Sequence, residues 1–393
     1  MIPIKTKSQP LSLGQLSCFI LLLIFSISFT SCESDNSTND SDSDENELTA
    51  LELVAADSPN QITWMANDAV TSRNGDAMGY GVVLNPDSQK LLIFLDGGGA
   101  CFNNITCSGN IDSFTEDDFF QRISNQNALI IDRDAADNQF ADWNFVFVPY
   151  ATGDVHSGSN SAADVPNGGP NNQVMTGFSN VSVILNELKT YFDANGGVSE
   201  IVFSGSSAGG FGMYLNTVQL ASVFGTATPT TVLVDSGPVF LETSILTPCL
   251  ESTWNNLWSL NNNLPNDLDT VVQSTYDFNL QKVYEYLAVK YPTFNYGFIS
   301  TYEDTTIRGF YSFGQDNCPV VPLQLLSAEA FRDGLMTIKT NVLDNHDNWK
   351  VFYKEGTSHT FLGSATLNET VNGTTLNQWI ADLRNGTASD LVE

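Results

Sequence analysis

A serine nucleophile is the first chemistry that the sequence offers. Ser207 stands in the stretch SGSSAGG (residues 204–210), between the apolar run EIVF and the helix-like run FGMYLNTVQLASVF. The spacing G-x-S-x-G is that of a nucleophile elbow, in which a serine occupies a tight turn between a strand and a helix. Gly205 and Gly209 leave room for such a turn, and a helix start favours developing negative charge. This context predicts that Ser207 is a nucleophile.

A serine needs a general base, and the chain contains three histidines, His156, His346 and His359. His359, in EGTSHTFL, follows the last strand-like run, and the order serine, acid, histidine is that of α/β-hydrolases. We therefore expect His359 to be the base. His346 has the setting of an exposed loop residue. His156 precedes the serine, so we expect that it and Asp154, in PYATGDVHSG, either bind substrate or hold a loop.

The acid that orients the histidine should follow Ser207 in the chain. Four carboxylates are candidates: Asp304, Glu303, Asp235 and Asp316. Asp304 follows the strand-like run YGFISTY and has the usual position, so we expect it to complete the triad. Asp235 ends the preceding strand-like run, and Glu303 is adjacent to Asp304, so both stay open as alternatives. Asp316 is a weaker candidate because it neighbours a cysteine.

The run LDGGGACFN ends another strand-like segment and supplies candidate oxyanion donors. Successive glycines let backbone N–H groups face a ligand without side-chain obstruction, as in oxyanion loops of the HGGG type. We expect Gly98 and Gly99 to provide such groups, together with the N–H of Ala208, directly after the nucleophile.

The N-terminus predicts export. Residues 1–31 have lysines followed by a short apolar core, as in a secretory signal, and FTSC, ending at Cys32, resembles a bacterial lipobox. Cys32 would then carry lipid. Residues 32–52 are rich in Ser and Asp and predict an acidic tether, which leaves residues 53–393 as one catalytic domain. We expect a lipid anchor in the bacterial outer membrane, with ordinary secretion as the alternative.

The formal net charge of −30 limits the kinds of partner that the protein can bind. Most of this charge lies on the domain rather than on the tether. Such an acidic surface argues against binding nucleic acid or an anionic membrane face. We expect a monomer that meets the membrane only through its anchor.

Four cysteines remain after the signal and the anchor: Cys101, Cys107, Cys249 and Cys318. An even number in an exported chain indicates disulfides, with Cys101 and Cys107 closing a small loop and Cys249 and Cys318 bridging distant segments. There is no C-x-x-C pair or histidine cluster, so the sequence implies no metal and no organic cofactor.

Short apolar runs alternate with amphipathic, helix-like segments along the domain. This alternation predicts an α/β fold with a doubly wound, mostly parallel sheet and helices on both faces, and chemistry at the carboxyl ends of the strands. The expected strands are residues 90–99, 143–150, 200–205, 230–237, 296–302 and 349–356, and the clearest expected helices are residues 179–197, 210–224 and 269–291.

Together these motifs resemble the pectin acetylesterase/Notum family of serine carboxylesterases, from about residue 63 to the C-terminus. The matching segments are LLIFLDGGGACFNNITC, PYATGDVHSG, FSGSSAGG, VLVDSG and GTSHTF. The resemblance implies an α/β-hydrolase fold, a triad of Ser207, Asp304 and His359, and removal of O-acetyl or other short acyl groups from an extracellular polysaccharide such as pectin. Ala100 stands where the family has Trp or Tyr, and Ala151 stands where it often has Cys. The first difference implies a wider mouth that also accepts propionyl and butyryl esters.

Three alternatives remain open at this point. The same fold could carry a serine peptidase or a lipid-type deacylase, although nothing in the chain specifies a peptide side-chain pocket. A non-catalytic, glycan-binding surface lipoprotein is the third, and intact Ser207 and His359 argue against it.

Overall fold

The structure, a computed structural model, describes residues 48–125, 130, 132–135, 137–363 and 367–393. The expected signal (1–31), the expected lipidation site Cys32 and residues 33–47 of the expected tether lie outside the described residues. Residues Leu48–Glu393 form one compact unit. Within the described ranges, no helix has the length and apolar character needed to cross a membrane.

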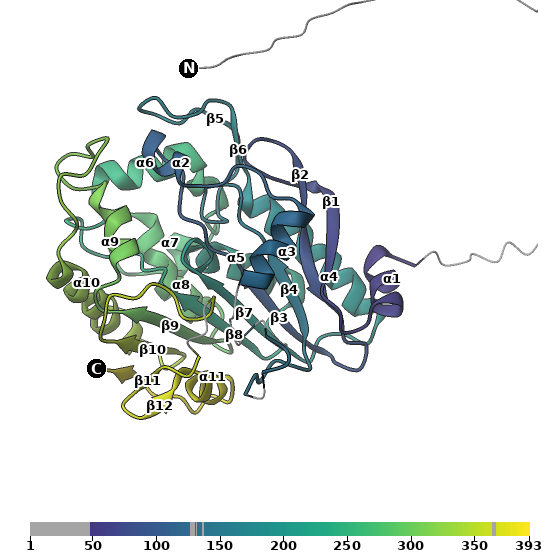
Figure 1. The fold of residues 1–393 in the computed structure, drawn as a ribbon. Helices are drawn as coiled ribbons and strands as arrows, with labels where there is room; N and C mark the ends of the chain where they lie inside the picture. Colours follow the sequence, from purple (N-terminus) through teal and green to yellow (C-terminus); the bar gives the residue numbers. More distant parts are fainter. Residues whose placement is uncertain (1–47, 126–129, 131, 136, 364–366) are drawn as a thin grey trace, which may run out of the picture. The chain divides into compact units, whose positions relative to one another are not determined.

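A nine-stranded sheet forms the centre of this unit (Figure 1). Its order is β1-β2-β4-β3-β7-β8-β9-β10-β13, in which β1 and β2 are antiparallel to their neighbours and the remaining pairs are parallel. The strands are β1 (Thr63–Thr71), β2 (Ala77–Val83), β3 (Lys90–Leu95), β4 (Asn144–Val148), β7 (Glu200–Ser206), β8 (Thr230–Asp235), β9 (Asn295–Thr301), β10 (Trp349–Lys354) and β13 (Leu391–Val392). The expected α/β fold with a mostly parallel sheet is confirmed.

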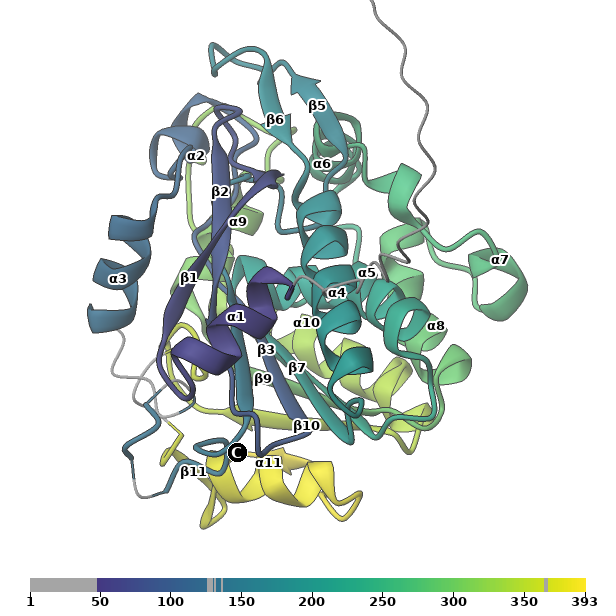
Figure 2. The same ribbon diagram turned by 90° about the vertical axis from the view of Figure 1, so that its right-hand side faces the viewer.

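Helices pack around the sheet. Figure 2 shows α4 (Gly177–Ala194), α5 (Ala208–Phe224) and α8 (Val283–Lys290) on one side of it and α3 (Glu116–Asn125) on the other. Helix α11 (Leu376–Arg384) packs on β9, where the side chains of Trp379 and Leu383 lie over Gly297. The remaining helices are α1 (Ala50–Asp57), α2 (Asn104–Ser108), α6 (Pro248–Trp258), α7 (Leu268–Val271), α9 (Thr305–Ser312) and α10 (Ala328–Asn341), with 3-10 turns η1 (Leu260–Asn263), η2 (Asn279–Lys282) and η3 (Leu343–Asn345). Two small hairpins pair β5 (Asn160–Ala163) with β6 (Gln173–Met175) and β11 (Thr370–Val371) with β12 (Thr374–Thr375).

All six expected strands are present, whereas two expected features differ. The single helix expected over residues 269–291 is divided into α7, η2 and α8, because Ser, Thr, Asp and Asn between residues 274 and 279 favour turns over helix. Helix α1 begins inside the range assigned to the tether. The side chains of Thr49 and Glu52 form a capping box there, and Leu51 is buried, so the structured unit starts a few residues before residue 53.

The parallel strands β4 and β8 are buried along their whole lengths, and β7 is buried after its first residue, as expected for a sheet covered on both faces. Loops that carry the candidate catalytic residues leave the carboxyl ends of β3, β7, β9 and β10. Since these strands are parallel, their carboxyl ends share one edge of the sheet. This edge brings together segments that are far apart in the sequence.

Candidate active site

Ser207 occupies the turn between β7 and α5 in a strained conformation. Its φ and ψ are 56° and −118°, a region that non-glycine residues rarely adopt, and strain of this kind is typical of functional positions. Two glycines make the turn possible. A side chain at Gly205 would collide with the backbone of Gly209, and a side chain at Gly209 would collide with the carbonyl of Leu95. The turn therefore fixes Ser207 at the carboxyl end of β7, as the elbow motif predicts.

The structure pairs Asp304 with His359. Oδ2 of Asp304 accepts a hydrogen bond of 2.7 Å from Nδ1 of His359, which lies on the loop after β10. Oδ1 of Asp304 accepts the N–H groups of Thr306 and Ile307 at 2.9 and 3.0 Å and so caps the start of α9. Both oxygens of this fully buried carboxylate have partners, and the pair fixes the proton of the imidazole on Nδ1, which leaves Nε2 as an acceptor.

The other three carboxylates do not contact the imidazole of His359. Asp235 is buried, and its Oδ2 accepts the hydroxyl of Ser206 and the N–H groups of Phe361 and Leu362 at 2.7–2.8 Å. The pKa of Asp235 is raised, because burial outweighs these hydrogen bonds, which lower it. Asp235 thus anchors the loop that carries His359. Glu303 is half-buried and Asp316 is exposed, and neither accepts a hydrogen bond from a histidine.

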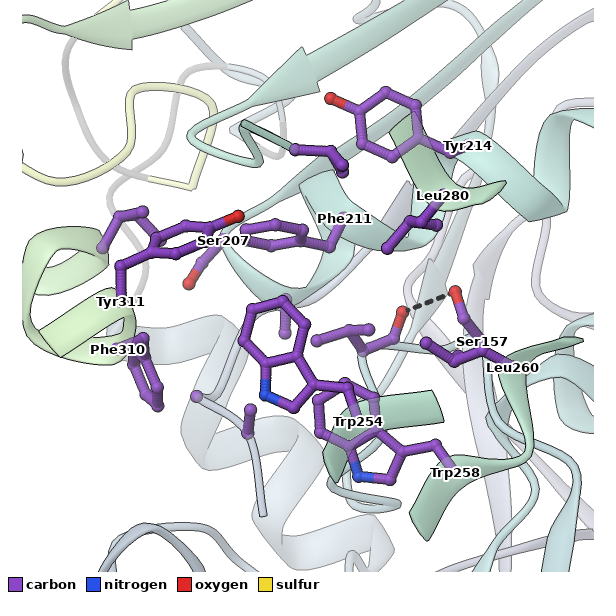
Figure 3. A pocket seen from close by; sticks show the side chains of 16 residues that line it. Ser157, Ser207, Phe211, Tyr214, Trp254, Trp258, Leu260, Leu280, Phe310 and Tyr311 are labelled. Carbon is purple, nitrogen blue, oxygen red and sulfur yellow. Dashed lines mark hydrogen bonds between the residues drawn. The ribbon is translucent and has the colours of Figure 1, made fainter. Parts of the chain in front are cut away.

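An apolar pocket opens beside Ser207 (Figure 3). It encloses about 600 Å³, including the part open to solvent. In Figure 3 Ser207 lies at one side with Tyr311, and Leu260 and Leu280 lie at the other. The wall residues have apolar or aromatic side chains almost throughout, and the largest are Phe211, Tyr214, Trp254, Trp258, Phe310 and Tyr311.

The apolar pocket adjoins a smaller cavity. Trp254, Leu260 and Leu280 also line this smaller cavity, whose other walls include Glu251 and Asn255. These three side chains therefore lie between the two cavities.

Ser207 also lines a second pocket, which is more polar than the first. Its lining includes the glycines of residues 97–99, Arg122, Ser207 and His359. Nη2 of Arg122 donates to Oδ1 of Asp96 at 2.8 Å. Ser207 thus lies where an apolar pocket and a polar pocket meet, and Gly99 also lines both.

The glycine segment lies against the elbow. A side chain at Gly97 would reach within 3.0 Å of Cβ of Ser207, one at Gly98 would reach within 2.8 Å of the ring of Tyr150, and Gly99 has φ of +82°, which favours glycine. Among the described residues, no acceptor takes the N–H of Gly98 or Gly99. The N–H of Ala208 is the first in α5, and such groups have no partner within the helix. These three N–H groups fit the expected oxyanion donors.

Asp154 and His156, expected either to bind substrate or to hold a loop, line neither of the two pockets at Ser207. Both are buried, at 0% and 2% exposure. Asp154 accepts the hydroxyl of Thr152 and the N–H of Gly177, and burial raises its pKa. Nε2 of His156 donates to the carbonyl of Asp96 at 2.9 Å, and burial lowers the pKa of His156 to about 4. The loop-holding role is the one that the contacts support.

Both expected disulfides are present, Cys101–Cys107 and Cys249–Cys318. The first closes the segment that follows the glycines. The second joins the start of α6 to the segment after α9, and these two helices carry Trp254, Phe310 and Tyr311 of the apolar pocket. Disulfides fit an exported protein.

The apolar pocket itself was not predicted from the sequence. Trp254 and Trp258 are four residues apart and lie on one face of α6, but aromatic residues with this spacing are also typical of an ordinary buried helix face. The adjacent pair Phe310 and Tyr311 gives no periodic signal. Only the tertiary structure brings these residues to Ser207.

Comparison with known proteins agrees with this geometry. A family model described as Pectinacetylesterase matches residues 75–385. The palmitoleoyl-protein carboxylesterase NOTUM of Homo sapiens is 27% identical over 160 residues, which are 40% of this chain and 31% of the relative. NOTUM of Schmidtea mediterranea is 31% identical over 139 residues (34% and 24%), and notum2 of Xenopus laevis is 27% identical over 187 residues (45% and 36%). The chain thus spans between about a quarter and a third of the length of these curated relatives.

The fold and the site define an α/β-hydrolase-like protein with a serine at its elbow. The chain belongs to the pectinacetylesterase family, since the family model covers most of its length. The printed names of this family and of its curated relatives both describe the hydrolysis of esters.

Proposed function

We propose that the protein is a serine carboxylesterase that forms an acyl-enzyme on Ser207. His359 takes the proton of the Ser207 hydroxyl on Nε2 as the oxygen attacks the acyl carbon, and Asp304 stabilises the resulting imidazolium. The N–H groups of Gly98, Gly99 and Ala208 stabilise the oxyanion. The alcohol leaves with the proton from His359, and a water that His359 activates then releases the carboxylic acid. The observation that carries this proposal is the Asp304–His359 pair at the same pocket as Ser207.

The chemistry of the two pockets supports a separate place for each half of the ester. The apolar pocket offers no charged group and suits an acyl chain, whereas the polar pocket, with Arg122 and His359, suits the hydroxyl-bearing leaving group. We propose that the leaving group is a polysaccharide hydroxyl and that the acyl group is acetyl or a longer chain. Ala100 lines the apolar pocket with only a methyl group, which supports an acyl group longer than acetyl.

A lipid-type deacylase is the second candidate. The aromatic walls favour it, since Phe211, Trp254 and Phe310 would bury methylenes at about 0.8 kcal/mol each. The names of the curated relatives also describe removal of palmitoleoyl groups from proteins. The two candidates share the mechanism and differ in chain length and in the carrier of the acyl group.

A series of p-nitrophenyl esters from acetyl to palmitoyl, together with an acetylated pectin, tests the proposal. We expect hydrolysis by the wild-type protein and none above background by Ser207→Ala, with circular dichroism showing that the variant is folded. A rate maximum at two to four carbons supports the polysaccharide esterase, and a maximum at eight carbons or more supports the lipid-type deacylase. Wild-type rates in Ser207→Ala would rule out both.

We also propose that the mature protein begins at Cys32 and is lipid-anchored, acting as a monomer outside the cytoplasm. The lipobox-like FTSC and the acidic segment after it support this. Labelled palmitate should enter the wild-type protein in a bacterial host and be absent from Cys32→Ala. An unlipidated N-terminus at another residue would place the protein among soluble secreted enzymes.

A further inference from the structure

Three consecutive peptide carbonyls in the glycine segment are each held by a different side chain. The carbonyl of Asp96 accepts Nε2 of His156 at 2.9 Å, that of Gly97 accepts Nη2 of Arg122 at 3.3 Å, and that of Gly98 accepts Nδ2 of Asn110 at 2.7 Å. These donors come from separate segments, after β4, in α3 and after α2. The segment is therefore fixed from outside rather than by a helix or strand of its own.

The orientation of these carbonyls determines where the next N–H groups point. In a trans peptide the C=O of one residue and the N–H of the next point in opposite directions. Because the carbonyl of Gly98 points toward Asn110, the N–H of Gly99 points away from Asn110. That N–H lies in the segment that lines both pockets with Ser207.

Asn110 makes the shortest of the three contacts and is itself firmly placed. Its side chain is buried, its N–H donates to the carbonyl of Cys107 at 3.2 Å, and its carbonyl accepts Nη2 of Arg73 at 2.8 Å. The Cys101–Cys107 disulfide closes the preceding loop. Since the backbone of Asn110 has these anchors, a change of its side chain removes the contact with Gly98 while the backbone contacts remain.

Gly99 depends on such an external contact. Its φ of +82° lies in a region where glycine has wide freedom, so the peptide between Gly98 and Gly99 has no intrinsic preference for the catalytic orientation. An oxyanion hole acts only if its donors are oriented before the charge develops.

The geometry points to Asn110 as a positioning residue of the oxyanion hole, which orients the Gly99 N–H by holding the Gly98 carbonyl. This inference rests on the proposed esterase function. Asn110 touches neither of the two pockets at Ser207 and acts through the peptide. Arg122 and His156 hold the two preceding peptides in the same way.

The test compares Asn110→Asp and Asn110→Ala with Asn144→Ala. Asp has nearly the same shape but no N–H donor. Asn144 is a matched control, because it is also buried and donates to two backbone carbonyls, those of Ser88 and Lys90, at the opposite end of the sheet. The measurements are kcat and KM with p-nitrophenyl butyrate and the Ki of an alkyl boronate, which binds Ser207 as a tetrahedral mimic. Thermal melting checks the fold.

Removing one oxyanion donor typically lowers kcat by about 10² to 10³. Misdirecting one donor should therefore lower kcat by about 10- to 100-fold. We expect this loss in both Asn110 variants with KM within about threefold, and a rise in the boronate Ki of similar size, because the donor acts only in the tetrahedral state. Asn144→Ala should melt at a lower temperature with kcat unchanged.

Retention of kcat within threefold in a folded Asn110 variant overturns the inference, and so does a loss confined to KM or a loss equal to that of Asn144→Ala. Should Asn110→Asp fail to fold, Asn110→Ala and Asn110→Ser decide. A wild-type protein that hydrolyses none of the esters overturns the proposed function instead, which separates the two failures.

Discussion

Asp304→Asn should nearly abolish turnover while leaving the fold intact. Oδ1 of Asp304 accepts two backbone N–H groups at the start of α9, and an asparagine carbonyl can keep both, since asparagine is among the best N-cap residues. The amide nitrogen must then replace Oδ2 and face Nδ1 of His359. A donor in this place favours the tautomer with the proton on Nε2, so the imidazole can no longer accept the proton of Ser207.

The expected loss of kcat follows from the loss of the general base and of the buried negative charge. In triads where the acid is changed to its amide, the wrong tautomer lowers kcat by about 10⁴. We expect a loss of about 10³ to 10⁴ in kcat, or about 4 to 5 kcal/mol at 1.36 kcal/mol for each factor of ten. The assay is steady-state hydrolysis of p-nitrophenyl butyrate, with a thermal melt for each variant.

The other carboxylates serve as controls. Glu303→Gln and Asp316→Asn should retain activity within a few-fold. Asp235→Ala should lower stability as well as activity, because it leaves two backbone N–H groups of the His359 loop without their acceptor. If Asp304→Asn keeps more than about a tenth of wild-type kcat, a loss too small for such an acid, the assignment of the triad is wrong.

Two further substitutions test the pocket wall and the buried histidine. Leu280→Ala should open the apolar pocket into the adjoining cavity and shift the preferred acyl chain to one longer by two or more carbons. Each additional methylene that is buried should raise kcat/KM for the longer ester by about fourfold. An unchanged ester profile would show that Leu280 does not close the pocket. The pKa of His156, lowered to about 4 by burial, predicts a pH effect on stability. Below pH 6.5 the unfolded chain binds a proton at His156 that the folded chain does not bind until about pH 4, so the free energy of unfolding falls as the pH is lowered through this window. Between pH 7 and 4.5 this fall should be about 2 to 3 kcal/mol larger in the wild-type protein than in His156→Asn, measured by urea denaturation; equal falls would contradict the lowered pKa.

The sequence predicts the parallel part of the sheet well because its strands are buried on both faces. Runs such as LLIFL in β3 and TTVLVD in β8 are short and apolar and end in turn residues. The antiparallel strands β1 and β2 carry no such signal. TWMANDAVT in β1 has no continuous apolar run, because Asn67 and Asp68 interrupt it. AMGYGVV in β2 contains two glycines, one of which would collide with the backbone of Met65 if it carried a side chain.

The candidate site likewise has a part that the sequence predicts and a part that it does not. Ser207, His359 and the glycine segment are predictable because their motifs are local and require specific residue types. The supports of the site are contacts between distant segments, such as Asn110 with Gly98 or Asp235 with the His359 loop, and no local pattern indicates them. His156 shows most clearly what the sequence cannot decide. Its position after a strand end suits a substrate-binding residue, but in the structure it is a buried donor to a backbone carbonyl.

The most direct test of the account is covalent labelling of the nucleophile. A fluorophosphonate should react with the wild-type protein in a ratio of one to one, peptide mass spectrometry should place the adduct on Ser207, and loss of esterase activity should follow the labelled fraction. Ser207→Ala should take no label, and Asp304→Asn should label far more slowly. Label on another residue, or full ester hydrolysis by protein whose Ser207 is completely modified, would contradict the acyl-enzyme mechanism.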